Sequence, residues 1–301
     1  MISVITPNYN HAKFLNERLD SIFSQTFQDF ELIILDDCST DNSREIIESY
    51  RNSPNVSIHY NSKNSGSPFK QWKKGIMLAK GEYIWIAESD DLAEPTFLET
   101  MVEKLKAGNG LAYCRSGDMD EYGNKKSDSF WADGLDEKRW KSDFENEGSK
   151  EIQNYLVYRN TIPNASACVF EKKHVPLESK FDEMRFCGDW LFWIKLLEKT
   201  SVTYSSDTLS HFRHHYGSTR NQKTPKDELQ KKLEIISIIE LVRKKHKLGL
   251  PIESEFPNYD WVTKGFYRQL MIPETLKDQI IFYSNRYFPN LYSSYRKLTF
   301  R

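Results

Sequence analysis

Short apolar runs alternate with amphipathic stretches along the first third of the chain. The pattern predicts strands over 2–6, 31–35, 56–60, 82–87 and 111–115, and helices over 11–24, 69–80 and 96–107, with another helix beginning near 41–43. The run at 31–35 ends in uninterrupted apolar residues, which is typical of a strand buried on both faces. Strand–helix alternation at this spacing favours an α/β fold with a mostly parallel central sheet flanked by helices.

The rest of the chain is less regular. Residues 117–148 are polar and rich in Gly, Asp and Lys, which predicts a long loop or an irregular insertion. Helical patterns at 151–159 and 190–198 and strand-like patterns at 165–170 and 209–214 follow, and a charged amphipathic helix is predicted over 227–247. We therefore divide the chain into a first half (1–116), a second half of the same domain (117–220) and a C-terminal helical extension (221–301).

Composition narrows the class of protein. The chain of 301 residues is 39% hydrophobic and 14% aromatic, so it is expected to fold, and its net charge of −1 gives no support for broad nucleic-acid binding. No apolar run is long enough to span a bilayer, and the N-terminus lacks the features of a signal peptide, so we expect a cytoplasmic protein. The four cysteines are scattered without a CxxC pair, so neither structural zinc nor a disulfide framework is expected.

Polar clusters follow three of the predicted strands. They are Thr6 to Asn10, Asp36-Asp37, and Glu88 to Asp91. In parallel α/β sheets, ligands bind beyond the carboxyl ends of the strands. Glu88 and Asp90 lie two positions apart, so in extended backbone both carboxylates point the same way and could bind Mg²⁺ or Mn²⁺ together with phosphate oxygens. The alternative is a solvated acidic turn that caps the next helix.

Three further polar positions have a functional and a structural interpretation each. Asp37 could accept hydrogen bonds from a base or ribose, whereas Ser39 and Asp41 fit helix capping. Asp189 could be a general base, or it could cap the helix that follows it. His215, at the end of Arg213-His-His, could bind a metal or a diphosphate, or it could be structural.

Taken together, these pieces resemble the family 2 inverting glycosyltransferases, which have the A-type fold. The resemblance rests on segments in the family's order: Val4-Ile-Thr-Pro-Asn-Tyr-Asn10, Leu35-Asp-Asp-Cys-Ser-Thr-Asp-Asn-Ser43, Gly81-Glu-Tyr-Ile-Trp-Ile-Ala-Glu-Ser-Asp-Asp91, Gly188-Asp-Trp190 and Phe212-Arg-His-His215. It covers about residues 1–220. It implies that 1–116 is the nucleotide-sugar-binding half and 117–220 the acceptor-binding and catalytic half.

The resemblance also implies roles for individual residues. Donor contacts fall on Thr6, Pro7, Tyr9, Asp37, Ser89, Asp90 and Lys73, and metal ligands on Asp90, Glu88 and His215, with His214 as the adjacent alternative. Asp189 is similar to the catalytic base, and Asn164, Ser166 and Trp190 are expected near the acceptor. The implied cofactor is a divalent metal, Mn²⁺ or Mg²⁺.

The chain departs from the family pattern at three places. Glu88 replaces the more usual Asp of the metal motif, and Gly188 replaces the Glu of the usual Glu-Asp pair. Where the family often has Arg-Asn before a glycine, this chain has Lys70 to Gly75, so Lys70 or Lys73 could serve the diphosphate or could simply lie on a solvated helix face.

The implied activity is inverting transfer of a sugar from a nucleoside diphosphate sugar, most often a UDP-sugar, to an acceptor hydroxyl. Family association points to a glycan or lipid-linked glycan acceptor in bacterial-type surface polysaccharide biosynthesis. The aromatic and basic tail 283–301 could rest on the inner face of a membrane or on another subunit. The alternative function is a non-catalytic sugar- or nucleotide-binding module on a degenerate transferase scaffold, although such a module would be expected to lose Asp90 or Asp189.

Overall fold

The computed structural model describes residues 1–126, 132, 134–217 and 224–248. Residues 1–86 alternate strands and helices as the sequence pattern predicts. These elements are β1 (Ile2–Asn8), α1 (Ala12–Phe23), β2 (Phe30–Asp36), α2 (Ser43–Ser49), β3 (Val56–Tyr60), α3 (Pro68–Leu78) and β4 (Tyr83–Ile86). The predicted bounds of these strands and helices agree with the structure to within about two residues.

The rest of the described chain combines long strands and helices with several short, irregular elements. They are β5 (Leu92–Ala93), α4 (Phe97–Lys106), β6 (Leu111–Met119), η1 (Arg139–Lys141), β7 (Phe144–Asn146), α5 (Gly148–Glu151), η2 (Ile152–Leu156), η3 (Ala165–Ala167), β8 (Cys168–Glu171), η4 (Lys172–His174), η5 (Lys180–Glu183), α6 (Gly188–Leu197), β9 (Val202–Arg213) and α7 (Pro225–His246). The predicted helix at 151–159 is a short α-helix that continues as a π-helix. The last strand begins at Val202, seven residues before its predicted start at 209.

One mixed sheet runs through both halves of the chain. Its order is β3-β2-β1-β4-β8-β6-β9-β5, with β7 also paired to β9. The longest ladders, β1 with β2 and β6 with β9, are parallel, whereas β8 is antiparallel to both of its neighbours. This arrangement confirms the expected α/β fold with a mixed, mostly parallel sheet, and it places the carboxyl ends of β1, β2 and β4 at one edge.

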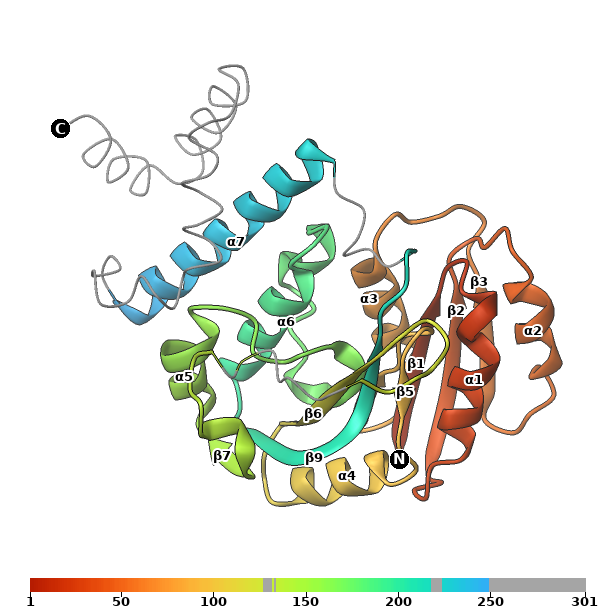
Figure 1. The fold of residues 1–301 in the computed structure, drawn as a ribbon, viewed down its shortest axis with the longest axis horizontal. Helices are drawn as coiled ribbons and strands as arrows, with labels where there is room; N and C mark the ends of the chain where they lie inside the picture. Colours follow the sequence, from red (N-terminus) through yellow and green to blue (C-terminus); the bar gives the residue numbers. More distant parts are fainter. Residues whose placement is uncertain (127–131, 133, 218–223, 249–301) are drawn as a thin grey trace.

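Helices cover both faces of the sheet. Since successive side chains of a strand point to opposite faces, neighbouring apolar residues of one strand pack against different helices. In β1, Val4 packs into a core with α1, α2 and α4, whereas Ile5 packs into a core with α3, α6 and α7. Figure 1 shows α7 lying beside α6 on the second of these faces. Since four apolar residues of α7 join this core, the helix is part of the domain's packing.

Three further predictions concern the C-terminal tail, membrane-spanning helices and the cysteines. The aromatic and basic tail 283–301, and the rest of the extension beyond 248, lie outside the described residues. Among the helices that are described, none combines the length and apolarity needed to cross a membrane. All four cysteines are free thiols, and three of them are buried.

Candidate functional site

Three polar turns meet at the carboxyl edge of the parallel strands. The predicted donor contacts Thr6 and Pro7 are buried inside β1, and Tyr9, just beyond its end, is 45% exposed. The Thr6 hydroxyl has no hydrogen-bond partner among the described residues, although it is fully buried. Residues 36–37 end β2, and residues 88–91 follow β4, so the sheet brings these turns side by side.

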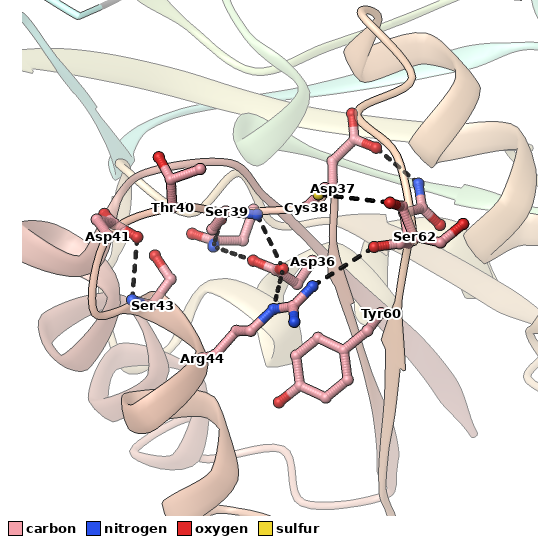
Figure 2. Close-up of polar contacts among 12 residues, drawn as sticks. Asp36, Asp37, Cys38, Ser39, Thr40, Asp41, Ser43, Arg44, Tyr60 and Ser62 are labelled. Atoms are coloured by element: carbon pink, nitrogen blue, oxygen red, sulfur yellow. Dashed lines mark hydrogen bonds and ion pairs between the residues drawn. The ribbon is translucent and has the colours of Figure 1, made fainter.

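Asp36 ties the end of β2 to its surroundings. Its carboxylate accepts hydrogen bonds from Asn8 Nδ2 at 3.1 Å and from the Ser39 backbone N–H at 3.1 Å. Arg44 Nε donates to the same carboxylate at 3.3 Å (Figure 2). Because these partners come from β1, from the following turn and from α2, Asp36 fixes the shape of this corner.

The two residues expected to cap a helix have different roles. Asp41 accepts hydrogen bonds from the backbone N–H of Ala12 at 2.9 Å and of Ser43 at 3.0 Å, so it serves the first turns of both α1 and α2. The N-cap of α2 is Asn42, which makes no side-chain capping bond, so Asp41 supports the helix start from the position before the N-cap. The Ser39 hydroxyl instead accepts from the Asn10 backbone N–H at 2.9 Å, which joins the β1 and β2 turns.

Asp37 is buried and organises the loop between β3 and α3. It accepts hydrogen bonds from Asn61 Nδ2 at 2.6 Å, from the Ser65 backbone N–H at 2.9 Å and hydroxyl at 2.7 Å, and from Gln71 Nε2 at 2.9 Å. Figure 2 shows its carboxylate extending away from that of Asp36. Asp37 therefore shapes one wall of the site, in addition to the donor contact predicted for it.

The acidic turn after β4 is held from three sides. Glu88 Oε1 accepts from Trp72 Nε1 at 2.6 Å, and the Glu88 backbone N–H donates to the Ser166 hydroxyl at 3.1 Å. Asp91 accepts from the Arg213 backbone N–H at 3.1 Å. Burial, reinforced by the charge of Asp90, raises the pKa of Glu88 to about 8 and that of Asp91 to about 7.

Asp90 is the member of this turn that faces two histidines. His215 Nε2 lies 2.9 Å from Asp90 Oδ2, although the two residues are 125 positions apart. One ligand atom from each of His11, Asp90 and His215 lies within 4.8 Å of the others. Burial alone would raise the pKa of Asp90, but the His215 hydrogen bond and the charge of His11 lower it overall.

The structure thus brings together the predicted pair Asp90 and His215 and adds His11, which the sequence analysis placed only at a helix start. His214 points elsewhere, with its Nε2 2.8 Å from Asp118 Oδ1 and its side chain half-exposed. Glu88 is not among the groups of potential metal ligands found in the described part of the chain.

Two buried arginines lie behind the acidic turn. Arg213 Nε donates to the Asp90 carbonyl at 2.8 Å, and its Nη2 pairs with Glu17 at 2.6 Å. Arg18 is fully buried with its guanidinium 4.7 Å from the Trp85 ring, and burial lowers the pKa of Arg18 to about 10. The positive charge of Arg18 offsets part of the repulsion among the three carboxylates.

Asp189, the predicted base, lies in the first turn of α6. Asn160 Nδ2 donates to its Oδ2 at 2.9 Å and the Trp190 backbone N–H donates to its Oδ1 at 2.8 Å, so both oxygens of the carboxylate are held. The start of α6 is held in turn by Glu234 of α7, which accepts from the backbone N–H of Phe186 and of Cys187 at 2.9 Å each. An acidic side chain in the first turn is also favoured by the helix dipole.

Two connections link α6 to the acidic turn. The segment 160–166 contacts Asp189 through Asn160 and Glu88 through Ser166. On the opposite side, the Trp72 ring packs edge-on against Phe192 of α6 with 6.0 Å between ring centroids. The proposed base and the acidic turn are therefore parts of one packed unit.

The remaining residues predicted to contact donor or acceptor form hydrogen bonds or ion pairs within the protein. Lys73 Nζ pairs with Asp182 at 3.1 Å, so a contact with a diphosphate would require this pair to open. Asn164 Nδ2 donates to the Ser116 hydroxyl at 3.0 Å, and Trp190 is buried with its Nε1 donating to a backbone carbonyl. Their predicted acceptor contacts stay predictions.

The raised pKa of Glu88 predicts a pH dependence of stability in protein freed of metal by a chelator. Between its ordinary value of 4.5 and about 8, the folded state holds a proton that the unfolded state has lost, so the free energy of unfolding falls as pH rises. Glu88→Gln keeps an oxygen for Trp72 Nε1 and should make this fall shallower, by at most about 1.4 kcal/mol per pH unit. Denaturant titrations at several pH values check this, and parallel curves for the two proteins would contradict it.

Gly188 stands where the resembling family has Glu, and packing explains the difference. A Cβ atom there would lie 2.4 Å from the Phe181 carbonyl oxygen and 2.5 Å from the Phe69 ring. We expect Gly188→Ala to lower the free energy of unfolding by about 1–3 kcal/mol through overpacking. Gly134→Ala is the control, because an added Cβ there has no neighbour within 4 Å. Equal denaturation midpoints for the two variants would contradict close packing of Phe181 and Phe69 around Gly188.

The amino-acid sequence of this chain is similar to those of known proteins. The family model described as glycosyl transferase family 2 matches residues 3–166. Glycosyltransferase GlyG of Streptococcus pneumoniae serotype 4 is 39% identical over 106 residues, which make up 35% of this chain and 35% of that protein. Poly(ribitol-phosphate) beta-N-acetylglucosaminyltransferase TarS of Staphylococcus aureus is 41% identical over 91 residues, 30% of this chain and 16% of TarS. The similarity thus spans about a third or less of these relatives.

A solved structure extends the likeness over almost the whole chain. The crystal structure of S. aureus TarS 1–349 in complex with UDP-GlcNAc superposes with a TM-score of 0.68 at 20% identity. The match covers 95% of this chain and 80% of that one. At this level of identity the match shows a shared fold.

Proposed function

Because this chain belongs to glycosyl transferase family 2, we propose that it transfers a sugar from a nucleoside diphosphate sugar to an acceptor hydroxyl with inversion at the anomeric carbon. The donor proposed is a UDP-sugar, supported by the UDP-GlcNAc in the TarS complex that shares its fold. The acceptor proposed is a bacterial-type surface polysaccharide or its lipid-linked precursor. The similarity to TarS, a poly(ribitol-phosphate) glycosyltransferase, supports this class of acceptor.

One observation carries the proposal: the fold places Asp90 and His215 in contact at the carboxyl edge of the sheet, beside the β1 and β2 turns. Thr6 in β1 and Asp37, directly after β2, are the nucleoside contacts that we propose at this edge. The crevice at such an edge is where doubly wound α/β sheets bind nucleotides.

Asp90 and His215 fit a divalent metal such as Mn²⁺ or Mg²⁺. Their ligand atoms lie 2.9 Å apart, and adjacent ligands of an octahedral ion with bonds of about 2.1 Å lie about 3 Å apart. When bound, such an ion would neutralise negative charge on the departing nucleoside diphosphate. The metal requirement is part of the proposal.

Asp189 would act on the acceptor. In the proposed reaction its carboxylate accepts the proton of the acceptor hydroxyl as that oxygen attacks the anomeric carbon. Asn160 and the Trp190 backbone N–H, each bonded to one carboxylate oxygen, would keep the carboxylate oriented for this proton transfer. The contact of Trp72 with Phe192 and the hydrogen bonds of segment 160–166 would hold this base at a fixed position relative to the donor-binding edge.

A screen of nucleotide sugars by thermal shift, with and without Mn²⁺, tests donor binding. We expect one class of nucleotide sugar to raise the melting temperature of the full chain, and more strongly with metal present. A screen in which no donor shifts the melting temperature under either condition would favour a degenerate, non-catalytic module. A shift by free sugars alone would point to the same alternative.

A further inference from the structure

His11 occupies a fixed place beside the Asp90–His215 pair. The preceding residue, Asn10, has a left-handed backbone with φ of 56°, and its side-chain oxygen accepts from the Thr40 backbone N–H at 2.7 Å. Asparagine tolerates this conformation better than most residues. The turn delivers the His11 ring to the edge of the sheet just before α1 begins.

Contacts on both sides fix the orientation of the His11 ring. His11 Nδ1 lies 2.8 Å from the Ser89 hydroxyl, and the ring meets that of His215 edge-on with 5.3 Å between centroids. Phe14 packs against both imidazoles, with its centroid 6.0 Å from His11 and 4.8 Å from His215. If Nδ1 donates its hydrogen to Ser89, the other ring nitrogen keeps a lone pair, which is the usual arrangement of a metal-binding histidine.

We propose that His11 is a third protein ligand of the divalent ion, so that the site consists of two imidazoles and one carboxylate. The three ligand atoms lie within 4.8 Å of one another, close to the span of about 4.2 Å between opposite ligands of a single ion. Small side-chain movements suffice to close this set around a metal.

The donor set determines which metal the site prefers. Mg²⁺ favours oxygen ligands, whereas imidazole suits first-row transition ions. The Glu88 carboxylate, which would add an oxygen ligand in the family's acidic motif, instead accepts the Trp72 hydrogen bond at 2.6 Å. The site therefore selects a transition ion such as Mn²⁺ over Mg²⁺, an inference that rests on the proposed function for the presence of a metal.

Metal binding to the full chain tests this inference without measuring turnover. Mn²⁺ is titrated into wild type, His11→Gln and His214→Gln, with and without UDP, and free Mn²⁺ is followed by electron paramagnetic resonance. We expect His11→Gln to weaken Mn²⁺ binding by at least about 10-fold, since loss of a group that only supports a metal ligand already costs about 10- to 100-fold. His214→Gln is the matched control, because this histidine bonds Asp118 outside the cluster, and its Mn²⁺ affinity should equal that of wild type.

Pulsed paramagnetic resonance then counts the histidines on bound Mn²⁺. We expect couplings from two imidazole nitrogens in wild type and from one in His11→Gln. A single coupled imidazole in wild type, or unchanged affinity in His11→Gln, would overturn the inference. If wild type binds UDP but no Mn²⁺, the three-ligand site is wrong while nucleotide binding stands. If it binds neither, the proposed function fails as well.

Discussion

Asp189→Asn should abolish most sugar transfer while leaving donor binding intact. Asparagine matches the shape of aspartate, and its one oxygen can keep one of the two hydrogen bonds that Asn160 and the Trp190 backbone N–H donate, but it cannot take a proton from the acceptor. General-base catalysis typically contributes about 10²–10⁴-fold, so we expect the turnover number to fall by that factor. Steady-state transfer rates and calorimetric titration with the donor, measured on the same preparation, separate the two effects.

The matched control for this variant lies on the same helix. Glu198→Gln neutralises the C-cap residue of α6, which pairs with Lys195 and with Lys245 of α7, and should keep wild-type turnover. An Asp189→Asn protein with near-wild-type turnover would remove Asp189 from the mechanism. An equal loss in both variants would point to damage of α6 instead.

Asp90→Asn should remove the effect of metal on donor binding. Without the carboxylate the site keeps only neutral ligands, so Mn²⁺ should no longer raise the affinity for the nucleotide sugar. The loss of leaving-group stabilisation should lower transfer by at least about 10²–10³-fold, the range seen when one such stabilising group is lost. Calorimetric titrations of the donor with and without Mn²⁺ give the first quantity, and transfer assays give the second.

The chain offers a close control for Asp90. Asp118 also accepts from a neighbouring histidine, His214, at 2.8 Å, but this pair is more exposed and lies apart from the Asp90 cluster. Asp118→Asn should therefore leave metal-dependent donor binding unchanged. If Asp90→Asn binds the donor with the same metal dependence as Asp118→Asn, Asp90 does not hold the metal.

Local patterns predicted the first half of the fold well because its strands and helices are regular. In β2 the apolar run 32–35 is buried on both faces, and β3 has the predicted bounds. In the second half, the predicted start of β9 is seven residues late, because the early part of the strand carries polar residues at 205–207 beside irregular pairing with β6. Strand β5, with two residues, is too short to give a periodic signal.

The site was predicted only where its residues follow strand ends or known motifs. Asp90 and His215 were expected near each other through the family resemblance, and the structure places them in contact. The roles of His11 and Trp72 depend on side-chain contacts across 78 and 16 positions, with Ser89 and Glu88 respectively, which local pattern does not reveal. The one available signal for His11 was its position directly after the Pro-Asn-Tyr-Asn segment.

The Gly188 position shows how packing limits an inference from family pattern. The sequence alone showed that Gly188 stands where the family has Glu, which put a second acidic contact to the acceptor in doubt. Phe181 and Phe69 fill the space that a side chain at 188 would need. The second acidic group of the family pair is therefore excluded sterically at this point of α6.

The most direct test of the proposed activity combines turnover with stereochemistry. Wild-type protein is incubated with Mn²⁺, the donor that the thermal-shift screen identifies and a panel of polyol and glycan acceptors, and nuclear magnetic resonance follows the anomeric proton of the transferred sugar. We expect release of nucleoside diphosphate and a product of opposite anomeric configuration to the donor. A product that retains the configuration, or no release of nucleoside diphosphate with any acceptor, would contradict inverting transfer by this chain.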